Sequence, residues 1–390
     1  MARMTERRND IDWLRALAML VVFFFHCARF FDDGGWHAKS GEVSYGMSVF
    51  VGVVAQWLMP LFFVLSGISS YYALNYLRSR PYLGARVKRL LVPLIVGSLT
   101  HISFQVYIER ATHGGFSGSF FAFYPHYFDG FYAFGGNFAW MGLHLWYLEM
   151  LFLFSLITLP FFIWTRSEKM KKTMAGIAGF LAKPCAVFLL AVPLGIVESL
   201  VNLDPRGVGT RDFGGWALFP HLVFFVSGYL LATDGGLRPA LEKQRAAALG
   251  MGIIATAVGF YLLEYADLSP YGYPFSFLRA FNSWFWLVAI LGFGSKHLNF
   301  NNRALEYAGE AVLPFYILHQ SVIIVIGYFM IDWTASVMLQ YVFLCVTSFA
   351  AIMTIYELGV RRFNAMRFLF GMKLKRREAP HPEPLAEMTT

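Results

Sequence analysis

Long runs of apolar residues dominate the hydrophobic pattern of this chain, and only a few polar positions interrupt them. A run of about 20 apolar residues is long enough for a helix that crosses the hydrocarbon core of a bilayer. About ten such runs follow one another, at roughly 12–31, 49–74, 90–108, 138–164, 185–201, 216–233, 246–263, 276–295, 307–330 and 335–360. We therefore predict an all-α, polytopic membrane protein with about ten transmembrane helices around a polar cavity.

The same pattern divides the chain into three parts. Residues 1–11 form an N-terminal segment, and residues 12–360 form the transmembrane domain. Residues 361–390 form a tail that is first basic and then, after Gly371, contains Pro and Glu. Segments of that polar composition cannot bury enough apolar surface to fold, so we expect the end of the tail to be disordered.

The composition agrees with burial in lipid rather than with a water-soluble fold. Hydrophobic residues make up 57% of the 390 positions and charged residues only 14%, whereas a soluble domain carries about 25% charged residues. The mean hydropathy is +0.52. We therefore expect the lipid bilayer to be the main partner of the chain. Its net charge of +8 then belongs to loops at a membrane surface and does not indicate nucleic-acid binding.

The positions of Lys and Arg predict the orientation in the membrane. If the N-terminus is cytoplasmic, the inner segments hold all of the 32 Lys and Arg residues except six, namely Arg29, Lys39, Arg110, Arg206, Arg211 and Arg279. This distribution agrees with the positive-inside rule. An odd number of spans would break the agreement, so we predict an even number and two cytoplasmic termini.

The first apolar run contains two ionisable residues, Arg15 and His26. They are separated by about three helical turns, so they share one helix face roughly 16 Å apart. Ionisable groups inside a span are costly and mark functional sites. Arg15 at the inner mouth and His26 deeper in the bilayer would suit an anionic ligand that enters from the cytosol. Alternatively, Arg15 reaches lipid phosphates and His26 bonds to a neighbouring helix.

Polar residues also interrupt later runs. Gln105 lies in the third, His144 and Glu149 in the fourth, and His319 and Gln320 in the ninth. A buried carboxylate such as Glu149 needs a cation or a proton as its partner. For any one of these residues, a hydrogen bond between helices is the simpler interpretation. Together they indicate a polar cavity between the helices.

A basic segment follows the second run. Arg86 and Arg89 are three residues apart and therefore share a face where a helix begins. Clusters of this kind serve as topology signals. They also suit a cytosolic phosphate site, because guanidinium groups bind phosphate oxygens bidentately.

Five segments, taken in order, resemble the acyltransferase-3 family of integral membrane enzymes. The first is the family's Arg-x10-His signature, which Arg15 and His26 match within IDWLRALAMLVVFFFH. The others are LFFVLSG at 61–67, the basic segment from Arg86 to Pro93, HLWYLEMLF at 144–152 and LPFYILHQSVIIVI at 313–326. The resemblance spans about residues 10–360, and the last two segments are most similar to the branch of periplasmic-glucan succinyltransferases.

The resemblance implies an O-acyltransferase in the bacterial inner membrane. Such an enzyme would move a succinyl or acetyl group from cytosolic acyl-CoA to a hydroxyl of a periplasmic or cell-surface glycan. Acyl-CoA would be a co-substrate, and we expect neither a tightly bound cofactor nor a metal. The carboxylate of a succinyl group would require a cation near the outer end, for which Arg29 and Arg279 are candidates.

The resemblance also assigns roles to residues. It implies that His26 is the catalytic histidine, and we expect Glu149 or His319 to orient His26 or to carry its proton away. Three cations would bind the acyl-CoA donor: Arg15, Arg86 and Arg89. The matching segments supply further residues to the polar cavity, namely His144, Trp146, Tyr316, Gln320 and Ser66.

Several questions stay open at this point. The sequence does not decide whether His26 acts as a base or briefly holds the acyl group, nor which acyl group and acceptor hydroxyl are used. It also leaves open whether the chain forms a homo-oligomer. The alternative function is a proton-coupled secondary transporter that uses intramembrane His and Glu. Such transporters commonly contain inverted repeats, and here the internal similarity is limited to LFFVLSG at 61–67 and VFFVSG at 223–228.

Overall fold

The computed structural model describes residues 8–200, 218–266 and 273–375. Within these ranges the regular elements are helices, and the only β-type pairing is an isolated bridge between Phe131 and Phe138. This confirms the predicted all-α fold class. The end of the tail, which we predicted to be disordered, lies outside the described residues.

The helices that build the bundle follow the predicted apolar runs. They are α1 (Asn9–Arg29), α2 (Tyr45–Ala55), α3 (Leu58–Tyr76), α4 (Ser79–Arg86), η1 (Val87–Leu91), α5 (Val92–Leu99), α6 (Ile102–Thr112), α8 (Trp146–Thr165), α10 (Ala191–Leu200), α11 (Leu218–Leu231), α12 (Leu237–Tyr265), α13 (Tyr273–His297), α14 (Arg303–Tyr328), α15 (Val337–Thr354) and η6 (Ile355–Val360). Shorter or peripheral helices connect them: α7 (Phe120–Phe123), η2 (Tyr124–Phe128), η3 (Tyr132–Phe134), η4 (Leu143–Leu145), α9 (Glu168–Leu181), η5 (Ala186–Leu190) and α16 (Asn364–Leu369).

Eight of the ten predicted runs coincide with helical stretches long and apolar enough to cross a membrane, counted over the described residues. The fifth run forms η5 and α10, which pair with α9 at a bend of 115° and give at most one further span. Pro184 and Cys185, whose φ is +62°, interrupt the helix at this bend. The sixth run forms α11, which has only 14 residues. A hydropathy pattern alone does not show whether an apolar run is straight or bent.

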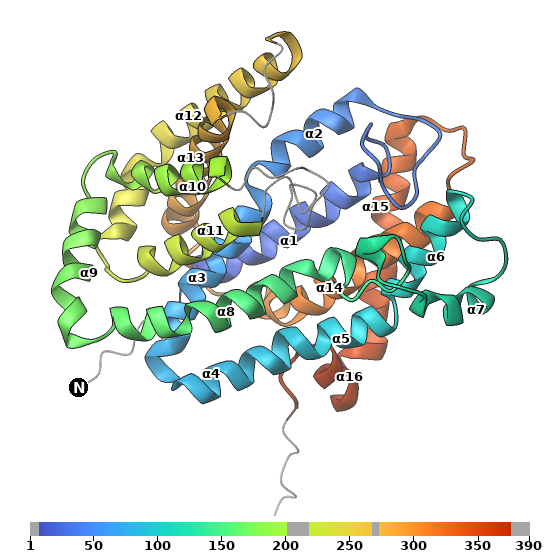
Figure 1. The fold of residues 1–390 in the computed structure, drawn as a ribbon, viewed down its shortest axis with the longest axis horizontal. Coiled ribbons are helices and arrows are strands. Elements are labelled where there is room, and N and C mark those ends of the chain that lie inside the picture. Colours follow the sequence, from blue (N-terminus) through green and yellow to red (C-terminus); the bar gives the residue numbers. More distant parts are fainter. Residues whose placement is uncertain (1–7, 201–217, 267–272, 376–390) are drawn as a thin grey trace, which may run out of the picture.

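Helix α1 lies in the middle of the bundle, as Figure 1 shows, and packs against α2, α3, α13, α14 and α15. Its buried face uses Leu14, which meets Gly294 of α13, and Phe23, which packs edge-to-face on Phe315 and Phe349. Helix α1 therefore buries one face in the bundle, while Leu17, Leu20 and Phe24 are exposed.

The outer helices expose their apolar side chains. On α12, the residues Ile253, Ile254 and Tyr261 are all exposed, and on α8 the same holds for Ile157. An aqueous surface would not tolerate such contiguous apolar faces, whereas lipid does. The exposed faces therefore agree with a multi-pass membrane protein.

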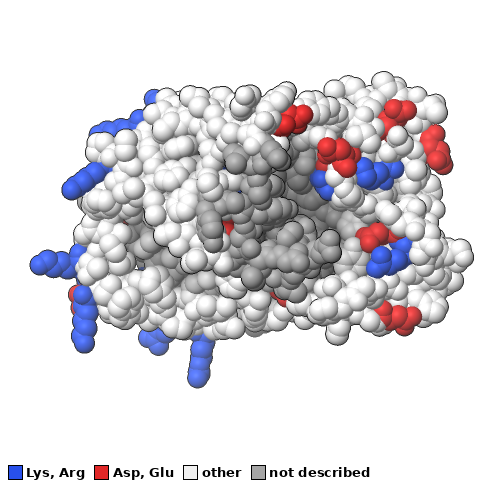
Figure 2. Space-filling model, turned by 45° about the horizontal axis from the view of Figure 1, so that its top comes forward, with Lys and Arg blue, Asp and Glu red and all other residues white. Residues whose placement is uncertain are grey.

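The start of α1 and the end of the described chain meet at one end of the bundle. Arg89 lies close enough to Arg15 and Asp12 of α1 for their charges to act on it, and Gly371 packs against the backbone of Arg89. In Figure 2, protruding Lys and Arg mark one end of the molecule, whereas Asp and Glu gather with a few basic residues at the other.

Candidate active site

A cavity of about 980 Å³ opens at the end of the bundle where α1 ends. Its lining comes from the last turns of α1, the following loop, α2, α3, α6, the segment around 132–146 and α14. Figure 2 shows the surface hollowed near the mixed acidic and basic end of the molecule. The volume is in the range of small-molecule sites.

Two histidines from distant parts of the sequence meet beside this cavity. His26 is a lining residue on α1, and His319 is fully buried on α14. The Nε2 atom of His319 lies 3.2 Å from Nδ1 of His26, and the two rings are edge-to-face. The structure therefore brings together two of the predicted catalytic residues.

The hydrogen-bond partners fix the tautomers of this pair. His319 Nδ1 lies 2.6 Å from the carbonyl oxygen of Tyr316, so Nδ1 carries the proton and Nε2 of a neutral His319 is an acceptor. His26 Nδ1 lies between two acceptors, namely His319 Nε2 and the Val22 carbonyl oxygen at 2.9 Å, so it carries a proton too. In a neutral His26, Nε2 is then the nitrogen with the lone pair.

A buried polar network supports the histidine pair from behind. Gln105 on α6 donates through Nε2 to His144 Nδ1 at 3.0 Å and to Ser321 Oγ at 2.7 Å. His144 Nε2 donates to the Ile317 carbonyl at 3.1 Å, and Gln320 donates to Gln105 Oε1 at 3.1 Å. Because these side chains all have hydrogen-bond partners, the network links α6, η4 and α14 and fixes their relative positions.

A seam of hydroxyl groups continues from the histidines toward the other end of the bundle. Tyr316 donates to the His144 carbonyl oxygen and packs at 6.0 Å from the ring of Tyr147. Tyr147 Oη lies 2.6 Å from Ser66 Oγ. One turn further along α3 lie Ser69 and Ser70.

Three arginines gather where this seam ends. Arg15 donates to Ser69 Oγ at 2.7 Å and Arg86 donates to Ser70 Oγ at 2.7 Å. Arg89 lies on the π-turn η1, four residues before Pro93, which has no N–H to donate to the Arg89 carbonyl. The charges of Arg15 and Arg86 act on Arg89. The predicted donor-binding residues therefore form one basic cluster, which lies outside the lining of the cavity.

The comparisons with known proteins agree with the motifs on these helices. An acyltransferase domain family, acyltransferase-3, matches residues 8–357 of the 390. The chain belongs to this family. It is therefore an acyltransferase, and the resemblance drawn from five sequence segments is confirmed.

Relatives of this acyltransferase include glucans biosynthesis protein C of Salmonella heidelberg, Salmonella typhi and Salmonella typhimurium. Each is 22% identical to the chain over 380 residues, covering 94% of this chain and 95% of the relative. No solved structure was found to match the chain.

Two other predicted site residues lie on α8. Trp146 lines the cavity and packs against His221 and Phe63. Glu149 is buried, and its Oε2 atom has no hydrogen-bond partner among the described residues. No hydrogen bond links Glu149 to His26 or His319 in the described parts of the chain, so the geometry favours His319 over Glu149 as the group that orients His26.

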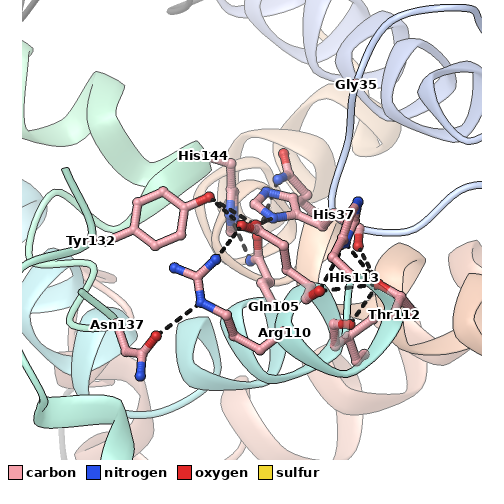
Figure 3. Close-up of polar contacts among 12 residues, drawn as sticks. Gly35, His37, Gln105, Arg110, Thr112, His113, Tyr132, Asn137 and His144 are labelled. Atoms are coloured by element: carbon pink, nitrogen blue, oxygen red, sulfur yellow. Dashed lines mark hydrogen bonds and ion pairs between the residues drawn. The ribbon is translucent and has the colours of Figure 1, made fainter. Parts of the chain in front are cut away.

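Sequence reasoning missed a second polar cluster in the cavity. Glu109 on α6 is hydrogen-bonded by His37 and by Tyr132, whose hydroxyl lies 2.9 and 2.8 Å from the two carboxylate oxygens. Arg110 contacts Glu109 at 3.1 Å and donates to Asn137 at 2.9 Å. Figure 3 shows the bond between Arg110 and Asn137. Burial and the adjacent Glu109 charge raise the pKa of Tyr132, which keeps its hydroxyl a donor. Only the abundance of His and Tyr in the segments that follow α1 and α6 could have drawn attention to these residues.

Proposed function

We propose that this acyltransferase moves a succinyl or acetyl group from acyl-CoA to a hydroxyl group of a glycan, with His26 as the base. The observation that carries this proposal is the position of His26. Its ring lines the cavity, while its Nδ1 atom is held by Val22 and His319. Nε2 is therefore the nitrogen left to take a proton from an acceptor.

The basic cluster supports an acyl-CoA donor. The nucleotide end of coenzyme A carries several phosphate charges, and Arg15, Arg86 and Arg89 offer three guanidinium groups within one region. Along α1, His26 lies roughly 16 Å beyond Arg15. The extended pantetheine arm would cover this distance beside the hydroxyl seam of Ser66 and Tyr147.

The reaction follows from these positions. The acceptor oxygen attacks the thioester carbonyl carbon, and its proton moves to His26 Nε2. The C–S bond then breaks, and the coenzyme A thiolate takes the proton from His26, which returns the histidine to its neutral form. His319 accepts the hydrogen bond from His26 Nδ1 throughout and steadies the imidazolium that forms in between.

The acceptor and the orientation rest on further observations. The relatives are named for glucan biosynthesis, which supports a glycan acceptor. A cytosolic donor requires the basic cluster to face the cytoplasm, and the Lys and Arg distribution supports this orientation. Both termini would then be cytoplasmic, in a bacterial inner membrane. Both candidates for a succinyl carboxylate already pair with an acid, Arg29 with Asp32 and Arg279 with Glu198. Arg29 is the better candidate because it lines the cavity, whereas Arg279 does not.

The test uses membranes that contain the full-length protein, labelled succinyl-CoA or acetyl-CoA, and a glucan acceptor. Label should enter the glucan with the wild-type protein, and His26→Ala should lower the rate by about 10²- to 10⁴-fold. Equal incorporation by wild type and His26→Ala, at matched amounts of folded protein, would refute the role of His26. Absence of label from both donors in the wild type would refute the proposed function.

A further inference from the structure

His37 faces the same cavity as His26. His37, on the loop after α1, lines the cavity and bonds through Nδ1 to the carboxylate of Glu109. A carboxylate accepts only, so His37 Nδ1 carries the proton and a neutral His37 has its lone pair on Nε2. The reaction described above makes no use of this pair.

Glu109 is held in place by more than one segment. It receives hydrogen bonds from His37 on the first loop and from Tyr132 on the segment after α7, and Arg110 pairs with it. Thr112 also donates to the His37 carbonyl at 3.1 Å. Figure 3 shows Tyr132, Arg110 and His37 converging on one point above α6. The orientation of His37 is therefore fixed before any ligand arrives.

An aromatic surface lies between the two histidines. Trp36 lines the cavity, and its ring centroid is 6.4 Å from that of His26 and 6.2 Å from that of His37. The Trp36 and His26 rings are inclined by 32°. A ring stacked on Trp36 would thus reach His26 with one edge and His37 with another.

We infer that Trp36 and the His37–Glu109 pair form the subsite that binds the sugar ring of the acceptor, a step that rests on the proposed function. A sugar ring has an apolar face, which suits stacking on an indole, and hydroxyl groups at its rim, which suit an imidazole acceptor. One hydroxyl donates to His37 Nε2 and positions the ring. A neighbouring hydroxyl then donates to His26 Nε2 and becomes the nucleophile. His37 binds the acceptor and takes no proton.

The experiment is steady-state kinetics with purified full-length protein in nanodiscs. Labelled succinyl-CoA or acetyl-CoA is the donor, whichever the wild type uses, and a glucose oligosaccharide is the varied acceptor. We expect His37→Leu, which removes the acceptor, and Glu109→Gln to raise the acceptor KM by roughly 3- to 10-fold, the range of one lost hydrogen bond between uncharged groups. The KM for the acyl-CoA donor should stay within a factor of about two, because the basic cluster is untouched.

A matched control exists on the surface. His126 and Asp129 form a His–carboxylate pair with an Nδ1–Oδ2 distance of 2.9 Å, but their side chains are 59% and 67% exposed, against 11% and 16% for His37 and Glu109. Neither residue lines the cavity. His126→Leu and Asp129→Asn should leave both KM values unchanged.

Three outcomes separate the hypotheses. An unchanged acceptor KM in His37→Leu, with an active wild type, would overturn the subsite and leave the proposed function intact. An equal rise of both KM values would also overturn it, because it would indicate a general loss of structure. A lowered melting temperature of Glu109→Gln would show that this substitution loosens the loops. In that case Trp36→Ala and Trp36→Phe test the subsite instead. The acceptor KM should rise in Trp36→Ala and change less in Trp36→Phe.

Discussion

In the interior of the bundle, Nε2 of His319 accepts a hydrogen bond from Nδ1 of His26 at 3.2 Å. Many catalytic histidines are oriented by a carboxylate, which must be paired or solvated to be stable when buried. A neutral imidazole provides the same acceptor without a charge. This arrangement suits a site inside a membrane, and it explains how His26 can be oriented without Glu149.

The first prediction concerns this pairing. In His319→Gln, the amide oxygen can accept the hydrogen bond from His26 Nδ1, whereas the side chain in His319→Leu cannot. We expect His319→Leu to lose about tenfold or more in kcat and His319→Gln to retain most of it, with both KM values unchanged. Steady-state kinetics of the purified variants measures the difference. Equal kcat values in the two variants would show that His319 only fills space.

The second prediction concerns the basic cluster. Arg86→Ala removes one guanidinium group that would bind a donor phosphate, so the KM for acyl-CoA should rise roughly 10-fold or more. The KM for the glycan acceptor should not change. Donor titrations at saturating acceptor measure the first KM, and acceptor titrations at saturating donor measure the second.

Arg78→Ala is the matched control for that experiment. Arg78 directly precedes α4, the helix that ends at Arg86, and carries the same charge, but its side chain is exposed. A purely topological role would make the two variants equivalent. If Arg78→Ala raised the donor KM as much as Arg86→Ala, the basic cluster would act only through its overall charge.

The sequence predicted the parts of the site that lie inside apolar helices. His26, His144, His319 and Gln320 stand out there because lipid-facing positions exclude such residues, and the structure places all four beside one cavity or its supporting network. Glu149 stands out for the same reason, yet it lies apart from them. Rarity in an apolar run indicates that a residue is special, but it does not indicate which neighbours it meets.

The second polar cluster, around Glu109, could not be predicted in this way. His37, Glu109 and Tyr132 lie in loops or at a helix end, where polar residues are ordinary. Their significance comes from three segments, far apart in sequence, that converge on one carboxylate. The periodicity of the sequence gives no indication that these three segments meet. The bend between α9 and α10 was missed for a related reason, since hydropathy does not report helix direction.

The last prediction concerns the two similar strings in α3 and α11. Gly67 and Gly228 occupy corresponding positions in LFFVLSG and VFFVSG, and the two helices pack on each other at both glycines. A Cβ atom on Gly67 would lie 2.0 Å from the Phe225 carbonyl oxygen, and one on Gly228 would lie 2.1 Å from that of Val64. Both obstacles are backbone atoms, which cannot move without shifting a helix. Small residues at such crossings let membrane helices approach closely.

We therefore expect Gly67→Ala and Gly228→Ala each to destabilise the protein by roughly 1–3 kcal/mol, the range of overpacked cores. Gly250→Ala on α12 is the control, because a Cβ atom there meets nothing within 4 Å. Ala also favours a helix more than Gly does, so Gly250→Ala should be neutral or slightly stabilising. Thermal unfolding in detergent measures the stability of all three variants.

The two destabilised variants should lose activity as well, because Ser66, which bonds to Tyr147, precedes Gly67 on α3. An unaltered melting temperature in Gly67→Ala would mean that α3 and α11 do not approach as closely as their glycines allow.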